Sequence, residues 1–445
     1  MLGLKLLQSA LNELSSKGRR KKFTAEQLTA RVSSIKTPSE RVSLKNADLS
    51  GEWLCGLFLQ GAKLSGSLLD NTNLSGSNLD RADMVRIQAI EADFDQATMN
   101  ESNLRSSIMR GSSMQGARLS KSDLSGCDMS HVSAREADFS GASMVEVDLS
   151  QSDIDRSTMV GIDARGARFP LEMVEVDMRD ASLEKTDLRG RRIVRCDVRG
   201  ARFTSSDMRE IDLTSTDVRE CEFRACQLSG ARLPNDLSGA SFSDIDLRDV
   251  DVRGKVMSRC TLTGCHLPLD LSGTDLSGVD LGDRDLSGLD LRETVLKGSN
   301  LSRCKLSGVQ LPLDLSGCDL SGVDLSGRDF ASFSLSNANL SRSNLSRSNL
   351  TGCKLSGCKL SGAQLPLDLS GCDLSGVDLT GRDLTGFNFS NANLSNANLS
   401  NTNLSNTNLS ETNLSNTNLS ETNLSNANLS NANLSNANLS NTNLT

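Results

Sequence analysis

Residues 44–83 read LKNADLSGEWLCGLFLQGAKLSGSLLDNTNLSGSNLDRAD, and a leucine returns there at every fifth position. We call this recurring apolar residue the centre, and the series of centres continues to Leu444. The residue two before a centre is usually small, the residue between them is usually Asp or Asn, and Ser-Gly or Ser-Asn often follows. A period of five fits neither an α-helix nor a flat strand. The chain is therefore predicted to turn after every five residues.

A square coil satisfies this pattern. The centre and the small residue point inward, the other three residues point outward, and Gly or Asn occupies each corner because both tolerate a positive φ. Four sides close one coil, and coils stacked about 4.8 Å apart give about 20 coils and a rod of roughly 100 Å. The interior takes two residues in five, which accounts for an apolar fraction of 37% with only 3% aromatics.

Segments such as Ala47-Asp48-Leu49-Ser50-Gly51 and Ala392-Asn393-Leu394-Ser395-Asn396 match the pattern A(D/N)Lxx residue for residue. Over about nine-tenths of its length, the chain resembles the pentapeptide-repeat family. The resemblance implies an all-β fold, a right-handed quadrilateral β-helix. It implies no single function, because one fold serves many.

Three regions are expected. Residues 1–43 form a basic, helical segment with six excess positive charges, in a chain whose net charge is −8. Residues 44–384 form the β-helix, and residues 385–445 continue it in low-complexity Asn/Ser/Leu repeats that hold only two charges, Glu411 and Glu421. The unbroken centres favour an Asn-laddered cylinder over disorder in this last region. Its final coil lacks a cap and is expected either to pair end to end, as in a homodimer, or to fray.

The N-terminal region contains two helix signals. Leu4, Leu7, Leu11 and Leu14 give one apolar helix face. After the basic run 17–22, residues 23–28 (FTAEQL) have the pattern of a hydrophobic staple and capping box. The basic run is expected either to contact nucleic acid or an anionic membrane, or to be a solvated linker while the helices cap the first coil.

The period slips by one residue five times, and a proline marks each slip. Proline cannot donate a ladder hydrogen bond, so stacking is expected to be interrupted or shortened on these sides. The slips are interpreted either as edges that a partner recognises or as tolerated irregularities copied by duplication of LPLDLSGCDLSGVDL. The prolines concerned are Pro170, Pro234, Pro268, Pro312 and Pro366.

Asp-x-Arg recurs every ten residues from Asp177 to Arg219, so in a square coil successive copies lie on opposite sides. These arginines form either a binding patch for an acidic partner or a surface lattice of ion pairs, each of which contributes little stability. With the five prolines, the candidate interaction surface comprises Arg179, Arg189, Arg192, Arg195, Arg199, Arg209 and Arg219.

Eleven of the twelve cysteines, all but Cys55, lie two residues before a centre. Buried thiols that pack as small apolar groups explain them better than metal ligands do. So many unpaired thiols suggest a reducing compartment, either the cytoplasm or the interior of a host cell. The sequence shows neither an apolar run long enough to span a membrane nor a cleavable signal peptide.

No catalytic, cofactor or metal constellation is expected, so an enzyme is not predicted. The first functional hypothesis is a rigid scaffold that binds an unidentified protein; some family members in bacterial pathogens are secreted effectors with a similar non-repeat N-terminus. The alternative is a DNA mimic that binds a type II topoisomerase, as the quinolone-resistance branch does. That branch dimerises through a C-terminal helix that this chain lacks, and Lys and Arg largely offset the Asp residues here. No direct contact of the rod with nucleic acid is expected.

Overall fold

The computed structural model describes residues 21–33 and 41–445. Two compact units are distinguished: Met1–Asp236 with Ala240–Asp251 and Thr263–Leu267, and Leu237–Gly239 with Val252–Leu262 and Pro268–Thr445. The helix face expected at Leu4–Leu14 lies outside the described residues. The boundaries expected after residues 43 and 384, between the three regions of the sequence, stay predictions.

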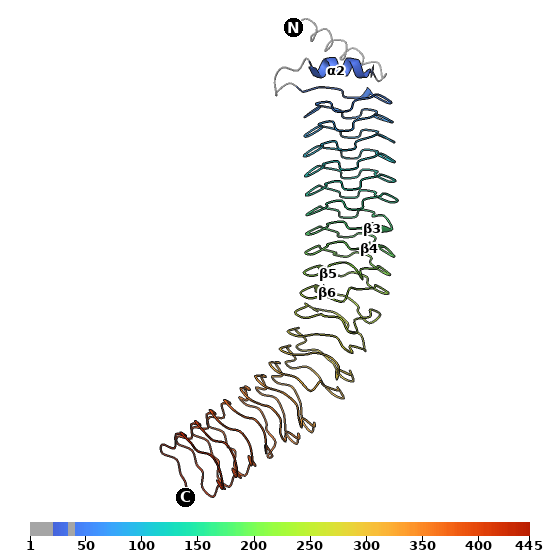
Figure 1. Cartoon of the computed structure of the whole chain (residues 1–445). Helices are drawn as coiled ribbons and strands as arrows, with labels where there is room; N and C mark the ends of the chain where they lie inside the picture. Colours follow the sequence, from blue (N-terminus) through green and yellow to red (C-terminus); the bar gives the residue numbers. More distant parts are fainter. Residues whose placement is uncertain (1–20, 34–40) are drawn as a thin grey trace. The chain divides into compact units, whose positions relative to one another are not determined.

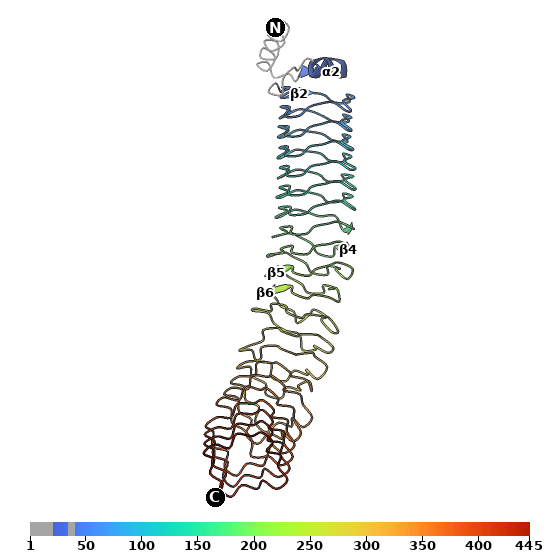
Figure 2. The same ribbon diagram turned by 60° about the vertical axis from the view of Figure 1, so that its left-hand side comes forward.

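The walls of each unit are parallel ladders between successive coils. Asp48 bridges Leu68, and Leu68 bridges Gln88, so equivalent residues lie twenty positions apart. Each side contributes so few ladder residues that regular strands are short: β2 (Ala47–Asp48), β3 (Glu172–Val174), β4 (Arg192–Val194), β5 (Glu222–Arg224) and β6 (Ser241–Ser243). β3 pairs with β4 and β5 with β6, both in parallel. Figures 1 and 2 show these stacked coils, and the predicted β-helix is confirmed.

The interior contains the residues that the period predicts. The centres from Leu44 to Leu424 are buried, except Leu267 and Leu365, which directly precede slip prolines and are half-buried; nearly every small residue two positions before a centre is buried as well. Many polar side chains inside bond to the preceding coil, as the hydroxyl of Thr72 does to the carbonyl of Leu49 at 2.9 Å, and others, such as Ser77, bond to a carbonyl of their own coil. Some centres are Phe, and the rings of Phe203, Phe223 and Phe242 stack with centroids 5.1 Å apart at each step. The core of each unit is therefore a column of side chains.

The corners have positive φ, as predicted, but they are not restricted to Gly and Asn. Gly51 has φ 74° and Asn46 has φ 53°, while Arg86, Glu91 and Ala225 adopt the same conformation at 51–55°. The hydrogen bonds on both sides of the corner fix the backbone, so a side chain with the wrong preference is tolerated at some cost.

A short helix covers the first coil. β1 (Lys21–Lys22) pairs in parallel with β2, and α2 (Ala25–Ser33) follows (Figure 1). The predicted capping box is present: the amide of Gln27 donates to the hydroxyl of Thr24 at 3.4 Å, and the amide of Thr24 donates to Oε1 of Gln27 at 3.2 Å. Glu52 accepts from the amide of Ala25 at 2.7 Å and thereby attaches the helix to the coil. None of the described helical residues forms a segment of the length and apolarity that a membrane span requires.

The Asn ladders expected in residues 385–445 are also present. Nδ2 of Asn413 donates to Oδ1 of Asn393 at 3.0 Å, and Asn433 repeats the contact with Asn413 at 3.2 Å. Among the last centres, Leu439 is 39% and Leu444 is 62% exposed. The last described coil therefore leaves part of its apolar interior uncovered.

Candidate interaction surface

Each slip changes the coil length by one residue. Thr158 bridges Asp177 and Lys354 bridges Asp373, so nineteen residues replace the usual twenty. The ladder is interrupted at the slip itself: Asp275 bridges Val295, but in the described part of the chain no bridge continues from Val295 to Asp314. The expected interruption and shortening of these sides are confirmed.

The prolines themselves are not the exposed edges that the sequence suggested. Pro170, Pro234, Pro268, Pro312 and Pro366 are all buried. The shortened side brings the ring into the wall, and the next residue takes the outward position. In four slips that residue is a leucine: Leu171, Leu269, Leu313 and Leu367 are 72%, 83%, 63% and 64% exposed. In the remaining slip it is Asn235, which is also exposed. These leucines were missed, although an apolar residue out of phase between Pro and Asp is a signal that could have found them.

Three slips are accompanied by an arginine inside the wall. Arg284, Arg328 and Arg382 each lie two residues before a centre, at the position that a small residue usually holds. Nη1 of Arg328 donates to the carbonyl of Val309 at 2.9 Å, and its Nη2 donates to that of Leu306. Burial lowers the pKa of Arg328 and of Arg382, as expected for a guanidinium removed from water. These cations supply hydrogen-bond donors to carbonyls just before the slip, in the coil where the ladder is incomplete.

The predicted surface arginines all lie beside carboxylates. The contact distances are Arg179–Asp177 2.7 Å, Arg189–Asp187 2.7 Å, Arg192–Glu172 3.0 Å, Arg195–Glu175 2.9 Å, Arg199–Asp197 2.5 Å, Arg209–Asp207 2.6 Å and Arg219–Asp217 2.6 Å. Arg199 also approaches Asp217 of the next coil at 3.6 Å, so the pairs form a continuous lattice. The hydrogen bond from Arg189 lowers the pKa of Asp187 to about 2. The geometry matches an ion-pair lattice, in which each arginine is already neutralised.

The aspartates near the last two slips have a different environment. In residues 311–384, no salt bridge joins any of them to a described Lys or Arg, and they accept hydrogen bonds from neutral groups. Asp319, for example, accepts from the amide of Ser321 at 2.9 Å and from Nδ2 of Asn339 at 3.1 Å. The eight residues are Asp314, Asp319, Asp324, Asp329, Asp368, Asp373, Asp378 and Asp383. This part of the surface therefore carries carboxylates without ion pairs.

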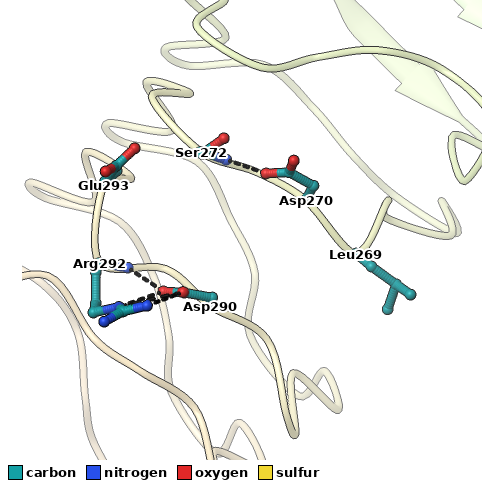
Figure 3. Close-up of a pocket in the computed structure, with 6 residues that line it drawn as sticks. All are labelled: Leu269, Asp270, Ser272, Asp290, Arg292 and Glu293. Carbon is teal, nitrogen blue, oxygen red and sulfur yellow. Dashed lines mark hydrogen bonds and ion pairs between the residues drawn. The ribbon is translucent and has the colours of Figure 1, made fainter.

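A shallow hollow of about 590 Å³ lies next to the Pro268 slip (Figure 3). Leu269, Asp270, Ser272, Asp290, Arg292 and Glu293 line it. Arg292 binds Asp290 with Nη2 at 2.6 Å from Oδ2, and this hydrogen bond lowers the pKa of Asp290 to about 2. Leu269 projects away from that ion pair (Figure 3). The hollow combines an apolar side chain with a polar, mostly acidic lining.

The cysteines are placed as predicted. Cys55 is exposed and the other eleven are buried, all as free thiols. Burial raises the pKa of Cys127, Cys221, Cys353, Cys358 and Cys372 to about 12. In the described residues, no group of three or more His, Cys, Asp or Glu side chains is arranged to hold a metal ion.

The profile of pentapeptide repeats matches eight stretches of the chain, which together exceed half its length: 59–96, 90–130, 135–169, 196–235, 270–308, 334–365, 372–410 and 407–445. No curated protein sequence matches the chain. Among solved structures, it is similar to HetL, a pentapeptide repeat protein involved in heterocyst differentiation regulation from the cyanobacterium Nostoc sp. strain PCC 7120. The identity is 18%, with 93% of this chain and 96% of HetL covered and a TM-score of 0.11.

Two further structures are similar. Full-length QnrB1, a plasmid-mediated fluoroquinolone resistance protein, is 20% identical, with 58% of this chain and 91% of QnrB1 covered and a TM-score of 0.11. Rfr23, a pentapeptide repeat protein from the cyanobacterium Cyanothece 51142, is 29% identical, with 30% of this chain and 92% of Rfr23 covered and a TM-score of 0.11.

Proposed function

Because the chain belongs to the pentapeptide-repeat family, we propose that it is a non-enzymatic scaffold that binds a protein partner through the side walls of its β-helix. The observation that carries this proposal is the set of exposed leucines after the slip prolines. Leu171, Leu269, Leu313 and Leu367 are 63–83% exposed, whereas the centres between them are buried, apart from the half-buried Leu267 and Leu365. Large apolar side chains that protrude from a polar wall are suitable anchors for a partner.

Folding does not account for these leucines. The slip at residues 233–237 (LPNDL) has Asn235 at the equivalent outward place, so the shortened side does not require an apolar residue there. The lumen thiols are also poor candidates for catalysis, because their raised pKa keeps them protonated and a thiol acts as a nucleophile only when ionised.

The test compares the full chain with a variant in which all four leucines are replaced by Asn, the residue that the chain itself uses at one slip. Both are immobilised and exposed to an extract of the source cells, and the captured proteins are compared quantitatively. Ile108→Asn is the matched control, because Ile108 is 41% exposed on a regular side. We expect specific partners to be depleted by the fourfold variant alone. Equal capture by all three proteins would refute the scaffold proposal in this form.

The second candidate is mimicry of DNA towards a type II topoisomerase. The aspartates of residues 311–384 that lack ion pairs favour it, since they give the walls an acidic character there. The ion-paired arginines at residues 179–219 weaken it, because they remove negative charge from much of the wall. Inhibition of gyrase supercoiling by the purified chain tests this candidate, and no inhibition at micromolar concentration would remove it.

A further inference from the structure

We infer that residues 311–384 bind a basic polypeptide segment that also carries apolar side chains, with Leu313 and Leu367 as its anchors and the surrounding aspartates as its electrostatic complement. This inference rests on the proposed scaffold function and names the chemistry of the partner. It concerns one of the two compact units alone.

This surface has a net negative charge, and its most exposed charged groups are predominantly acidic. Residues 311–384 contain eight Asp, no Glu and six Lys or Arg. Two of those six, Arg328 and Arg382, direct their guanidinium groups to main-chain carbonyls within the wall. The other four basic side chains are the exposed ones, so a partner that approaches the wall meets eight outward carboxylates and four exposed cations. A positively charged partner is attracted to such a surface, and an acidic one is repelled.

The aspartates are distributed as single charges. Along the wall, Asp314 is followed by Ser334, Lys354 and Asp373, and Asp319 is followed by Asn339. No two of these carboxylates are therefore neighbours in adjacent coils, which would be needed to chelate a metal ion. Spaced single carboxylates instead suit Lys and Arg residues distributed along a polypeptide.

The two leucines give such a partner a defined position. Leu313 directly precedes Asp314, and Leu367 directly precedes Asp368. Since the ladder from Asp314 leads to Asp373, Asp368 lies on the adjacent side of the coil. A partner that contacts both leucines must therefore pass around one corner while it crosses the aspartates. Val295, 47% exposed in the coil before Leu313, adds apolar surface at one end of this path.

The experiment measures binding of the full chain to a fluorescein-labelled helical peptide of Leu and Lys by fluorescence anisotropy. Two comparison peptides have Glu in place of Lys, or Ser in place of Leu. In the charge variant, Asp314, Asp319, Asp324 and Asp329 become Asn. The chain tolerates Asn at this position, because Asn393 accepts from the amide of Ser395 at 3.1 Å as Asp373 accepts from that of Ser375 at 3.2 Å. The anchor variant is Leu313→Asn with Leu367→Asn.

We expect the Leu/Lys peptide to bind most tightly, and each variant to weaken it about tenfold or more, as loss of buried apolar area or of complementary charge implies. Affinity should also fall as salt increases. The control variant changes four aspartates of the other unit that also directly precede a centre: Asp93→Asn, Asp123→Asn, Asp128→Asn and Asp138→Asn. It should bind like the natural chain.

Equal binding by the charge variant and the natural chain would overturn the inference about a basic partner. Tight binding of the Glu peptide would do the same. Unchanged affinity of the anchor variant would show that attraction is non-specific, and the leucines would lose their assigned role. None of these results alters the capture comparison between the natural chain and the fourfold leucine variant, so the scaffold function can stand or fall separately.

Discussion

The guanidinium of Arg382 donates from Nη1 to the main-chain carbonyl of Leu360, with the two atoms 3.1 Å apart. Its Nη2 donates to the carbonyl of Ala363. Both acceptors precede the buried Pro366, whose ring nitrogen cannot donate to the ladder. A cation at an inward position thus completes the hydrogen bonding of a side that proline has interrupted.

Replacing Arg382 by Met is expected to lower the free energy of unfolding by about 2–4 kcal/mol, because two buried carbonyls lose charged donors. Lys should restore only part of the loss, since it lacks the planar guanidinium that reaches two acceptors. Urea denaturation followed by circular dichroism provides the measurement. Arg292→Met is the control: Arg292 is 67% exposed and should matter little. Equal effects of both substitutions would contradict the structural role of Arg382.

Of the twelve thiols, one is expected to react in the native state. Cys55 is exposed, and the other eleven are buried within the wall and lumen. Titration with a thiol-specific chromophore at pH 8 should count one group before and twelve after denaturation. Rapid labelling of several native thiols would mean that the lumen opens readily to solvent.

The same thiols predict how stability depends on pH. Burial raises the pKa of Cys221 and Cys353 from an ordinary value of 9.0 to about 12. The unfolded chain therefore loses these protons first, and the free energy of unfolding should fall as pH rises from about 9 to 12. Denaturation midpoints across this range measure the effect. A Cys221→Ala, Cys353→Ala variant should show a shallower decline, and an identical decline would exclude these thiols as its source.

The phenylalanine stack should be sensitive to volume rather than to aromatic character. Phe223 lies between Phe203 and Phe242 with centroids 5.1 Å away on either side. Phe223→Ala is expected to cost about 3–5 kcal/mol, because it leaves a cavity in a closed lumen. Phe223→Leu should cost less, since Leu fills the same position in most coils. Thermal unfolding of the two variants distinguishes them, and similar losses would argue against a volume effect.

Two corner residues test the preference of glycine for positive φ, because their substitutions should change the free energy of unfolding in opposite directions. Ala225 has φ 51°, and Ala225→Gly should raise the free energy of unfolding by about 0.5–1 kcal/mol, because relief of strain exceeds the added entropy of the unfolded chain. Gly76 has φ 61° and open space where a Cβ would lie, so Gly76→Ala should lower it by a similar amount. Chemical denaturation measures both, and changes of the same sign would contradict this explanation.

The period-five pattern predicted the lumen correctly because stacking dictates it. Once the chain turns every five residues, the side chain at each centre can only point inward, as Leu49 and Leu399 do. Corner composition was predicted less completely: ladder hydrogen bonds hold Arg86 and Glu91 at positive φ against their intrinsic preference. Such a constraint belongs to neighbouring coils and is not visible in a local sequence window.

The candidate surface was harder to predict. The slips were identified, but one of their two interpretations gave the prolines the exposed role that the following leucines hold, because the inward shift of a shortened side depends on the coils around it. The role of Arg382 was missed for a similar reason, since Leu360 lies 22 residues earlier in the sequence. Arg189 and Arg199 were recognised as possible ion-pair partners, and the structure places each beside an Asp.

The four-sided coil links chain length to the direction in which a binding residue faces. Leu313 and Leu367 lie on adjacent sides, and the intervening repeats set that relation. Insertion of a single five-residue repeat between them would turn Leu367 by a quarter rotation relative to Leu313 while leaving the local structure of both slips intact. Gain or loss of repeats can therefore change the angle between the directions of two anchor leucines in steps of a quarter turn. Two chains with identical binding residues can then present different geometries to a partner.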